Sequence, residues 1–260
     1  MSEFRMASFN VNSVRSRLPV LRRWLEECPL DLLCLQETKA VDADFPLADF
    51  EAMGYRAVYR GEKSYNGVAI VSRIPLEDVA FGLGDGETPD GETRVVRCRC
   101  RGAYFVNTYI PQGKEITLPD YGVKLRFFAR LRELFDREYS GKPVLWTGDL
   151  NIAPTDADVT HPENKRTHVC FHEDAQAAYR DVLSWGFVDV FRKHRPDPGE
   201  FSFFDYRVKG ALERNIGWRI DHILATPELA ECSRDAFIDR EPRAWERPSD
   251  HTPVVGVFDL

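Results

Sequence analysis

The sequence predicts a layered α/β sandwich with largely antiparallel sheets. Short apolar or alternating runs, which are typical of strands, outnumber the stretches with helical spacing. Many gaps between these runs are only long enough for hairpins, whereas a strictly alternating parallel fold would need more helices. Neither a repeat of fixed period nor a linker-like stretch interrupts the 260 residues, so a single domain over 1–260 is expected.

The individual elements follow from these patterns. Strands are predicted at residues 5–12, 31–36, 67–72, 94–100, 104–110, 143–147, 218–225 and 253–258. Helices are predicted at residues 18–27, 121–139 and 174–185. In the second of these helices Leu125, Phe128, Leu131 and Phe135 recur at three or four residues, with Arg and Glu on the opposite face.

Composition and charge are those of an ordinary globular protein, with 43% hydrophobic and 30% charged residues. The apolar runs are too short to span a membrane and no secretory segment is evident, so a cytoplasmic (intracellular) protein with no membrane partner is expected. The six cysteines are scattered, which predicts reduced thiols. The net charge of 35 − 42 = −7 argues against indiscriminate binding to polyanions. It does not exclude an enzyme that acts on nucleic acid, because a local basic rim around an acidic metal site gives the same total charge.

Polar side chains gather at the ends of the predicted strands. The stretch LWTGDLNIAP, residues 145–154, ends an apolar run in a glycine, a carboxylate and an amide. One such cluster is usually a turn or a solvated strand end. Six coincident clusters predict instead the rim of an active site, formed by Asn10, Asn12, Gln36, Glu37, Lys39, Tyr109, Pro111, Gln112, Asp149, Asn151, Asp221, Asp250 and His251.

These residue types suit metal-assisted hydrolysis of a phosphodiester. Magnesium takes hard oxygen ligands and is commonly held by one or two carboxylates. Glu37 is therefore the leading ligand for Mg²⁺ (or Mn²⁺), with Asp250 and the side-chain oxygen of Asn10 or Gln36 as candidate helpers.

The remaining polar residues suit the activation of water and the stabilisation of charge. Asp149, oriented by Asn151, is the candidate for positioning and deprotonating the attacking water. His251 is placed to donate to a phosphate oxygen, with Asp221 fixing its tautomer, and Tyr109 to give a further hydrogen bond to the phosphate. Cysteines and serines show no comparable arrangement, which disfavours a covalent nucleophile.

The stretch THVCFHED leaves two interpretations open. His168 and His172 are four residues apart, with Cys170 between them, which is compatible with a zinc site. Alternatively the histidines lie in a surface loop and cap the helix that begins near Glu173. His172 is also a candidate for shaping access of the substrate.

Nine motifs follow one another between residues 4 and 257: SFNVNSVRSR, LQETK, NGVAIVSR, YIPQG, GDLNIAPTDAD, SWGFVDVFR, FSFFDYRVKG, WRIDHILA and PSDHTPV. In this combination they resemble the exonuclease III family of apurinic/apyrimidinic (AP) DNA endonucleases, within the endonuclease/exonuclease/phosphatase superfamily. The resemblance implies a four-layer α/β sandwich, two sheets face to face with helices outside. It also implies metal-dependent cleavage of DNA 5′ to abasic sites, with 3′–5′ exonuclease or 3′-phosphodiesterase activity.

The resemblance carries site roles over by position. It implies Glu37 as the main metal ligand with Asn10 nearby, and it places Tyr109 against the scissile phosphate. Asp149 would act on water with Asn151, and Asp221 would pair with His251; whether Asp149 or His251 is the base stays open. Some relatives have Asp where this chain has Asn12, which makes a second metal site less expected.

The resemblance also implies double-stranded DNA with abasic sites or 3′ ends as partner, bound by a monomer. Phe203, Trp218 and Ile220 match the positions that line the abasic pocket, whereas without the resemblance a core aromatic cluster would be the simpler interpretation. The expected DNA-backbone contacts are Lys39, Arg94 and Gln112. Charge pattern alone adds Lys114, Arg207 and Lys209, with Tyr206 and Arg207 as a candidate wedge.

Three alternative functions remain at this point. The chain is mainly a 3′-end-processing exonuclease, or a superfamily phosphatase acting on inositol phosphate or phospholipid, or a DNA-binding module without activity. YIPQG and the FSFFDY and GWRID segments argue against the phosphatase. The retained carboxylates and His251 argue against the inactive module.

Overall fold

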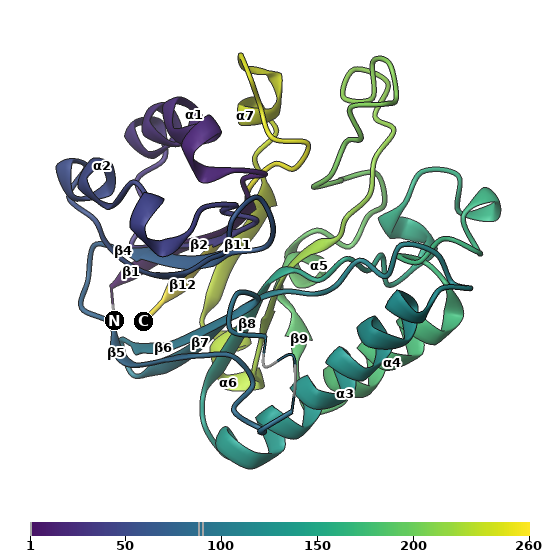
Figure 1. Ribbon diagram of the computed structural model, residues 1–260, viewed down its shortest axis with the longest axis horizontal. Coiled ribbons are helices and arrows are strands. Elements are labelled where there is room, and N and C mark those ends of the chain that lie inside the picture. Colours follow the sequence, from purple (N-terminus) through teal and green to yellow (C-terminus); the bar gives the residue numbers. More distant parts are fainter. Residues whose placement is uncertain (1, 88, 90) are drawn as a thin grey trace.

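The protein is built from two six-stranded sheets that lie face to face, with helices on the outer face of each (Figure 1). This arrangement is seen in a computed structural model that describes residues 2–87, 89 and 91–260. The strand orders are β11-β12-β1-β2-β4-β3 and β5-β6-β7-β8-β10-β9. The predicted sandwich is therefore confirmed.

The first sheet comprises β1 (Glu3–Asn10), β2 (Leu32–Gln36), β3 (Arg56–Arg60), β4 (Val68–Ser72), β11 (Ser233–Ile238) and β12 (Val254–Asp259). The second comprises β5 (Glu77–Phe81), β6 (Val95–Cys100), β7 (Ala103–Tyr109), β8 (Val144–Asp149), β9 (Val188–Asp189) and β10 (Asp221–Ala225). Within the described residues, β1–β2 and β7–β8 are the parallel pairs and the other paired strands are antiparallel. The sheets are mostly antiparallel, as predicted.

The two outer layers are helical. The first sheet is covered by α1 (Val14–Glu27) and α2 (Leu47–Ala52), and the second by α3 (Pro119–Glu138) and α4 (Glu173–Leu183) (Figure 1). Shorter helices complete the chain: α5 (Val190–His194), α6 (Pro227–Glu231) and α7 (Glu241–Ala244).

Alternation along the strands divides the apolar side chains among three packed layers. On β1, Phe4 and Met6 belong to the core between the sheets, whereas Ala7 and Phe9 belong to the core under α1. The third core lies between the second sheet and the helices α3 and α4. Because successive side chains of a strand face opposite sides, strands buried on both faces need apolar residues at nearly every position. The sheets are thereby held rigidly enough to position the polar residues at their ends.

One predicted strand begins later than expected. The prediction ran from 218 to 225, but β10 begins at Asp221. Trp218 instead forms isolated bridges with Val159 and Phe203. The chain before Asp221 therefore pairs with two loop segments rather than with the sheet, and this pairing brings Trp218 to the site described below.

Two further observations bear on the sequence predictions. Cys28, Cys34, Cys98, Cys100, Cys170 and Cys232 are all free, as expected for reduced thiols. Among the described residues, no helix combines the length and the apolar character that crossing a membrane requires.

Candidate active site at one edge of both sheets

The predicted site residues meet because β1, β2, β7 and β8 end, and β10 begins, at the same side of the sandwich. In the first sheet Asn10 of β1 lies in register with Gln36 of β2. In the second, Asp149 of β8 lies in register with both Tyr109 of β7 and Asp221 of β10. The face-to-face packing of the sheets then brings the two sets together.

The close packing of β8 against β7 explains the glycine that precedes Asp149 at the end of β8. A Cβ at this position would lie 1.9 Å from the carbonyl oxygen of Thr108, and the φ of Gly148 is +140°. Any side chain would push β8 away from β7. Glycine therefore allows the close approach that sets Asp149 beside Tyr109.

Asn10 joins the two carboxylates at the centre of the site. Its Nδ2 donates to Glu37 Oε1 and to Asp149 Oδ2, each at 2.8 Å. Its Oδ1 accepts from the backbone N–H of Asn12 at 3.0 Å. In this orientation Asn10 presents its amide nitrogen to the centre, which differs from the expected oxygen ligand. Gln36 is turned between the sheets, where its Nε2 donates to Asn107 Oδ1 at 2.6 Å.

His251 is held by a carboxylate on each side. Its Nδ1 lies 2.8 Å from Asp221 Oδ2, and its Nε2 lies 3.7 Å from Asp149 Oδ2. The same Asp221 oxygen accepts from Ser202 Oγ at 2.6 Å. Ser202 is a site residue that the sequence reasoning missed, although it lies in the FSFFDY stretch that the reasoning quoted. Asp221 thus orients the ring and directs Nε2 toward the centre of the site.

The electrostatics of this group follow from burial and close charges. Burial would lower the pKa of His251, but the negative charges of Asp221 and Asp149 outweigh it and raise the pKa to about 10. Burial raises the pKa of Asp149 to about 7, with Asp221 and Glu37 adding to the effect against the opposing charge of His251. For Glu37, burial acts upward, but hydrogen bonds from Asn10 and Lys39 lower the pKa overall.

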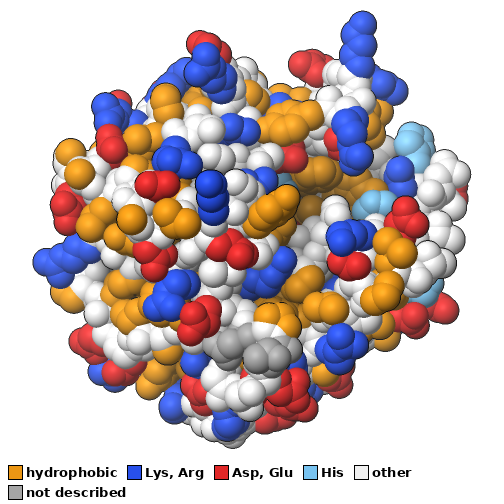
Figure 2. Space-filling view, in the orientation of Figure 1, with side chains coloured by type: hydrophobic (Ala, Val, Ile, Leu, Met, Phe, Trp, Pro, Cys, Tyr) orange, Lys and Arg blue, Asp and Glu red, His pale blue; other side chains and the backbone are white. Residues whose placement is uncertain are grey.

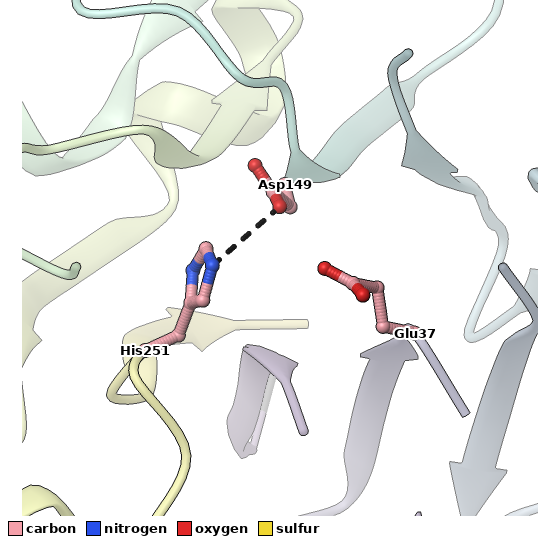
Figure 3. A group of neighbouring side chains, drawn as sticks. All are labelled: Glu37, Asp149 and His251. Atoms are coloured by element: carbon pink, nitrogen blue, oxygen red, sulfur yellow. Dashed lines mark ion pairs between the residues drawn. The ribbon is translucent and has the colours of Figure 1, made fainter. Parts of the chain in front are cut away.

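A divalent cation fits the centre of the site. Ligand atoms of Glu37, Asp149 and His251 lie within 4.8 Å of one another and point toward a common centre (Figure 3). Two carboxylates supply the hard oxygen atoms that Mg²⁺ and Mn²⁺ prefer. The raised pKa of His251 keeps its imidazole protonated at neutral pH, so it faces this centre as a hydrogen-bond donor rather than as a ligand. Asp250 lies outside this group, and its Oδ1 accepts from Asn12 Nδ2 at 2.9 Å. The roles of Asp250 and Asn10 as ligands stay predictions.

Asn12 is suited to its place as an amide. Besides donating to Asp250, its Oδ1 accepts from Lys39 Nζ at 2.6 Å. The same Lys39 nitrogen lies 2.8 Å from Glu37 Oε2. A carboxylate at position 12 would face the carboxylate of Asp250, and the two like charges would repel each other. The amide of Asn12 can instead donate to Asp250 and accept from Lys39 at the same time.

Left-handed backbone marks several of these positions. The φ angles are 43° at Asn12, 50° at Glu37, 50° at Lys39 and 49° at Asn151. Non-glycine residues rarely adopt this conformation, which is maintained where the surrounding structure enforces it and is frequent at functional sites. The sharp change of direction after each strand turns these side chains back over the ends of the sheets.

A cavity of about 650 Å³ opens beside this group. Figure 2 shows the hollow with hydrophobic side chains inside and Lys and Arg side chains around it. Its lining includes Glu37, Tyr109, Gln112, Asp149, Asn151, Phe203, Trp218, Ile220, Asp250 and His251. Of the predicted site residues, the cavity therefore brings together Tyr109, Asp149, Asn151, His251 and the three pocket residues, whereas its lining does not include Asn10, Lys39, Arg94 and Asp221.

The stretch THVCFHED forms part of the wall of this cavity. The ring of His168 packs on that of Trp218, with 4.6 Å between the centroids. His172 caps α4, its side chain accepting from the N–H of Asp174. The capping interpretation is therefore confirmed for His172. Within the described residues, the one group with metal-ligand spacing is Glu37, Asp149 and His251, and neither His168 nor His172 belongs to it.

The predicted DNA contacts lie at two neighbouring cavities. Gln112, Tyr206 and Arg207 line the first, whereas Arg94 and Lys114 line a second one that shares Tyr109 and Gln112 with it. The guanidinium of Arg94 lies 4.8 Å from the centroid of the Tyr109 ring and donates to the Tyr109 carbonyl at 3.2 Å. Arg207 is 89% exposed and paired with Asp205 at 2.7 Å. Tyr206 lies half-exposed at the rim, its hydroxyl donating to the Pro248 carbonyl at 2.6 Å. Their roles toward DNA stay predictions.

Comparison with known proteins agrees with this geometry. Residues 7–251 match the Endonuclease/Exonuclease/phosphatase family, and the chain belongs to that family. Exodeoxyribonuclease III of Haemophilus influenzae is 34% identical over 267 residues, covering 96% of this chain and 98% of the relative.

Two solved structures are similar over nearly the whole chain. An AP endonuclease from Archaeoglobus fulgidus is 48% identical with a TM-score of 0.96, covering 99% of this chain and 100% of that one. A 3′–5′ exonuclease from Neisseria meningitidis, NExo, is 37% identical with a TM-score of 0.95 and the same coverage; NExo is also described as a 3′ phosphatase, in a structure bound to product DNA hairpin. The resemblance to the exonuclease III family and the four-layer fold predicted from it are confirmed, and the chain is a phosphodiester hydrolase.

Proposed function

We propose that this protein cleaves the backbone of double-stranded DNA 5′ to abasic sites and also trims 3′ ends, by metal-assisted attack of water. The observation that carries the proposal is the cavity in which Phe203, Trp218 and Ile220 adjoin the group of Glu37, Asp149 and His251. An abasic nucleotide has no base, so it requires a small apolar pocket next to the reacting phosphate. A phosphatase for inositol phosphate would instead need polar groups there.

The protein's own residues supply positioning and proton transfer. Asp149 lies beside Asn151, whose backbone N–H donates to Asp149 Oδ1 at 2.9 Å, and this carboxylate positions and deprotonates the attacking water. His251 uses Nδ1 to bind Asp221, so Nε2 is left to donate toward the phosphate as negative charge develops. Tyr109 adds a hydrogen bond to the same phosphate.

Glu37 holds the metal ion, with Asn10 and Asp250 as the proposed helpers. Mg²⁺ or Mn²⁺, when bound, neutralises the charge that develops on the phosphate oxygens. A partly buried, hydrogen-bonded glutamate beside a second carboxylate suits this role, because hard divalent cations bind such oxygen pairs. Lys39 and Arg94 flank the group and, with Gln112, hold the DNA backbone on either side of it.

One observation bears on the balance between incision at abasic sites and trimming of 3′ ends. His168 occupies part of the cavity wall and packs on Trp218, which reduces the space beside the pocket residues. A flipped sugar inside a duplex needs that space more than a frayed 3′ terminus does. The balance between the two activities therefore depends on the position of this ring.

In this proposal the protein is a single domain that acts as a monomer inside the cell. The free cysteines support a reducing compartment. DNA as the partner is supported by the Neisseria relative, whose structure holds a product DNA hairpin.

The test uses a labelled duplex with a single synthetic abasic site, an intact duplex as control, and Mg²⁺ followed by EDTA. A metal-dependent incision 5′ to the lesion is expected, together with slower shortening from the 3′ end. Shortening from the 3′ end alone would leave the chemistry in place and make end processing the function. Release of inorganic phosphate from inositol phosphate, with both duplexes intact, would refute the proposal.

A further inference from the structure

Lys124 is a fully buried lysine that the proposed chemistry does not use. It lies on α3, and its side chain is 0% exposed. Its Nζ donates to three backbone carbonyls: Asn151 at 2.7 Å, Val169 at 2.7 Å and Gln112 at 3.2 Å. These carbonyls belong to the loop after β8, the cavity wall before α4 and the loop after β7. One amine therefore connects three segments that surround the cavity.

A lysine at this depth is unfavourable on its own. Burial lowers the pKa of Lys124, and no carboxylate of the described residues forms an ion pair with it. An apolar side chain of similar length would fill the same space without a charge to desolvate. The three carbonyls accept from all three N–H donors of the ammonium group. A Met or Leu in place of Lys124 would leave these carbonyls without that partner. The benefit of a lysine at this position is therefore that its hydrogen bonds hold the three loops together.

The packing around Lys124 is arranged to let it reach those loops. Gly113 has a φ of +96°, and a Cβ there would lie 3.2 Å from Tyr121 Cδ2 and 3.4 Å from Lys124 Cδ, so glycine lets this loop pass close to both side chains. Tyr121 lies three residues earlier on the same face of α3, and its hydroxyl lies 3.1 Å from both His172 Nδ1 and the N–H of Ala175. The first half of α3 is therefore an anchor for the cavity wall.

We propose that Lys124 is a positioning residue that fixes Asn151, and through it Asp149, relative to the cavity wall and the loop of Gln112. The path is short. Lys124 Nζ donates to the Asn151 carbonyl, and the Asn151 N–H donates to Asp149 Oδ1 at 2.9 Å. The amine thereby holds Asn151 in its left-handed conformation, with a φ of 49°. The catalytic consequence rests on the proposed function, whereas the coupling of the three loops does not.

Lys124→Met tests the inference, because methionine keeps the length of the side chain and removes the three donors. Hydrogen exchange of the full chain without DNA is expected to increase in all three segments, residues 110–113, 150–153 and 167–171, and to stay unchanged in β1. Single-turnover cleavage of the abasic duplex is expected to fall by about a hundredfold, the size of effect known for small misplacements of reacting groups. DNA binding is expected to change far less than turnover.

Phe128→Leu is the matched control, since Phe128 is buried on the same helix and packs toward Tyr179 of α4. It reports loss of α3 packing without loss of the three donors. Both variants are compared per folded molecule, and Lys124→Arg, which keeps donors and charge, is expected to recover part of the turnover. Exchange and turnover of Lys124→Met equal to those of Phe128→Leu would overturn the inference. Because exchange needs no substrate, the coupling is tested even if abasic DNA is not the substrate.

Discussion

Asp149 and His251 show how single residues acquire distinct roles from their surroundings. Both are buried, and they face each other across 3.7 Å. Asn10 and Asn151 supply hydrogen bonds to Asp149, whereas Asp221 binds the far nitrogen of His251. His251 therefore keeps Nε2 free of Asp221, and this nitrogen faces Asp149 Oδ2, which already accepts from Asn10. This arrangement selects the direction in which a proton can be exchanged.

Replacing Asp149 with asparagine is expected to remove most cleavage. Asp149→Asn keeps the shape of the side chain and its place beside Asn10, but it abolishes the carboxylate that acts on water. Single-turnover cleavage should therefore fall by about 10²- to 10⁴-fold. DNA affinity, measured by fluorescence anisotropy, should stay near that of the wild type. His251→Ala is expected to behave in the same way. Loss of affinity with unchanged turnover of the bound complex would contradict these roles.

Trp218 and His168 are expected to change substrate preference in opposite directions. Trp218→Ala removes a wall of the pocket and should weaken abasic-site incision more than 3′-end trimming. His168→Ala removes the ring that packs on Trp218 and should raise incision relative to trimming. The measurement is the ratio of the two initial rates on matched labelled duplexes. Equal losses on both substrates in Trp218→Ala would identify Trp218 as a packing residue only.

At the scale of elements, the loop after β8 is fixed by a buried ionic network. Arg219 donates through Nε to Asp158 Oδ1 at 2.7 Å and lies 2.8 Å from Asp189 Oδ2. Arg192 also pairs with Asp158. Burial alone would raise the pKa of Asp158, but the charges of Arg219 and Arg192 hold it well below its usual range. This network attaches the loop to the segment that carries Trp218.

The lowered pKa of Asp158 predicts a contribution to stability with a definite pH dependence. The unfolded chain binds the proton more tightly, so the stabilisation is complete above a pH of about 4 and is lost as the pH falls toward the folded pKa. Asp158→Asn should lower the free energy of unfolding at pH 7 by about 3–5 kcal/mol, because it removes a carboxylate from the fully buried Arg219, which keeps only Asp189, and from the partly buried Arg192. Chemical denaturation at pH 7 and at pH 3 measures both values, and the deficit should shrink at the lower pH.

Asp156→Asn is the control for this prediction. Asp156 pairs with Arg166 at 2.8 Å, but both side chains are more than half exposed, at 60% and 55%. An exposed pair of this kind contributes little to stability, because water screens the two charges. A deficit of the same size in both variants would show that burial of Asp158 does not matter to stability.

Element by element, the sequence was least informative at the edges of the sheets. The strands β3, β5, β9 and β11 were not predicted, and they are the four edge strands of the two sheets. Edge strands have one unpaired side and are partly exposed, as in β5, whose first three residues are all exposed. Their apolar pattern is weak for that reason. The central strands, buried on both faces, were all predicted to within a few residues.

At the scale of the whole molecule, the site unites residues from both sheets. Glu37 comes from the end of β2 and Asp149 from the end of β8, so a bound cation bridges the two halves of the sandwich. A ligand that binds only the folded state shifts the unfolding equilibrium in its favour. Metal binding is therefore expected to stabilise the entire fold.

Thermal unfolding with and without metal tests this expectation. At an Mg²⁺ concentration about 100 times the Kd the gain is about 2.7 kcal/mol, and each kcal/mol raises the Tm of a protein of this size by about 2–4 °C. Glu37→Gln should remove most of the shift, whereas Glu77→Gln, an exposed change on β5, should keep it. An equal Mg²⁺ shift in both variants would mean that the cation binds elsewhere.

The sequence by itself determined the chemistry, the family and the positions of the buried strands along the chain. These depend on residue types at strand ends and on short-range periodicity, as for Glu37, Asp149, Asp221 and His251, and these properties are written locally in the chain. The roles of these residues in the reaction stay predictions until the variants are measured.

The tertiary structure alone decided which atoms face the site. It turned the amide nitrogen of Asn10 toward the carboxylates, set Asp250 outside the three-residue group, placed His168 on Trp218 and brought Lys124 to three loops. The physical reason is that these contacts join segments that are distant in the chain. Their geometry is fixed by the packing of two sheets and α3 against one another, and no local pattern records it.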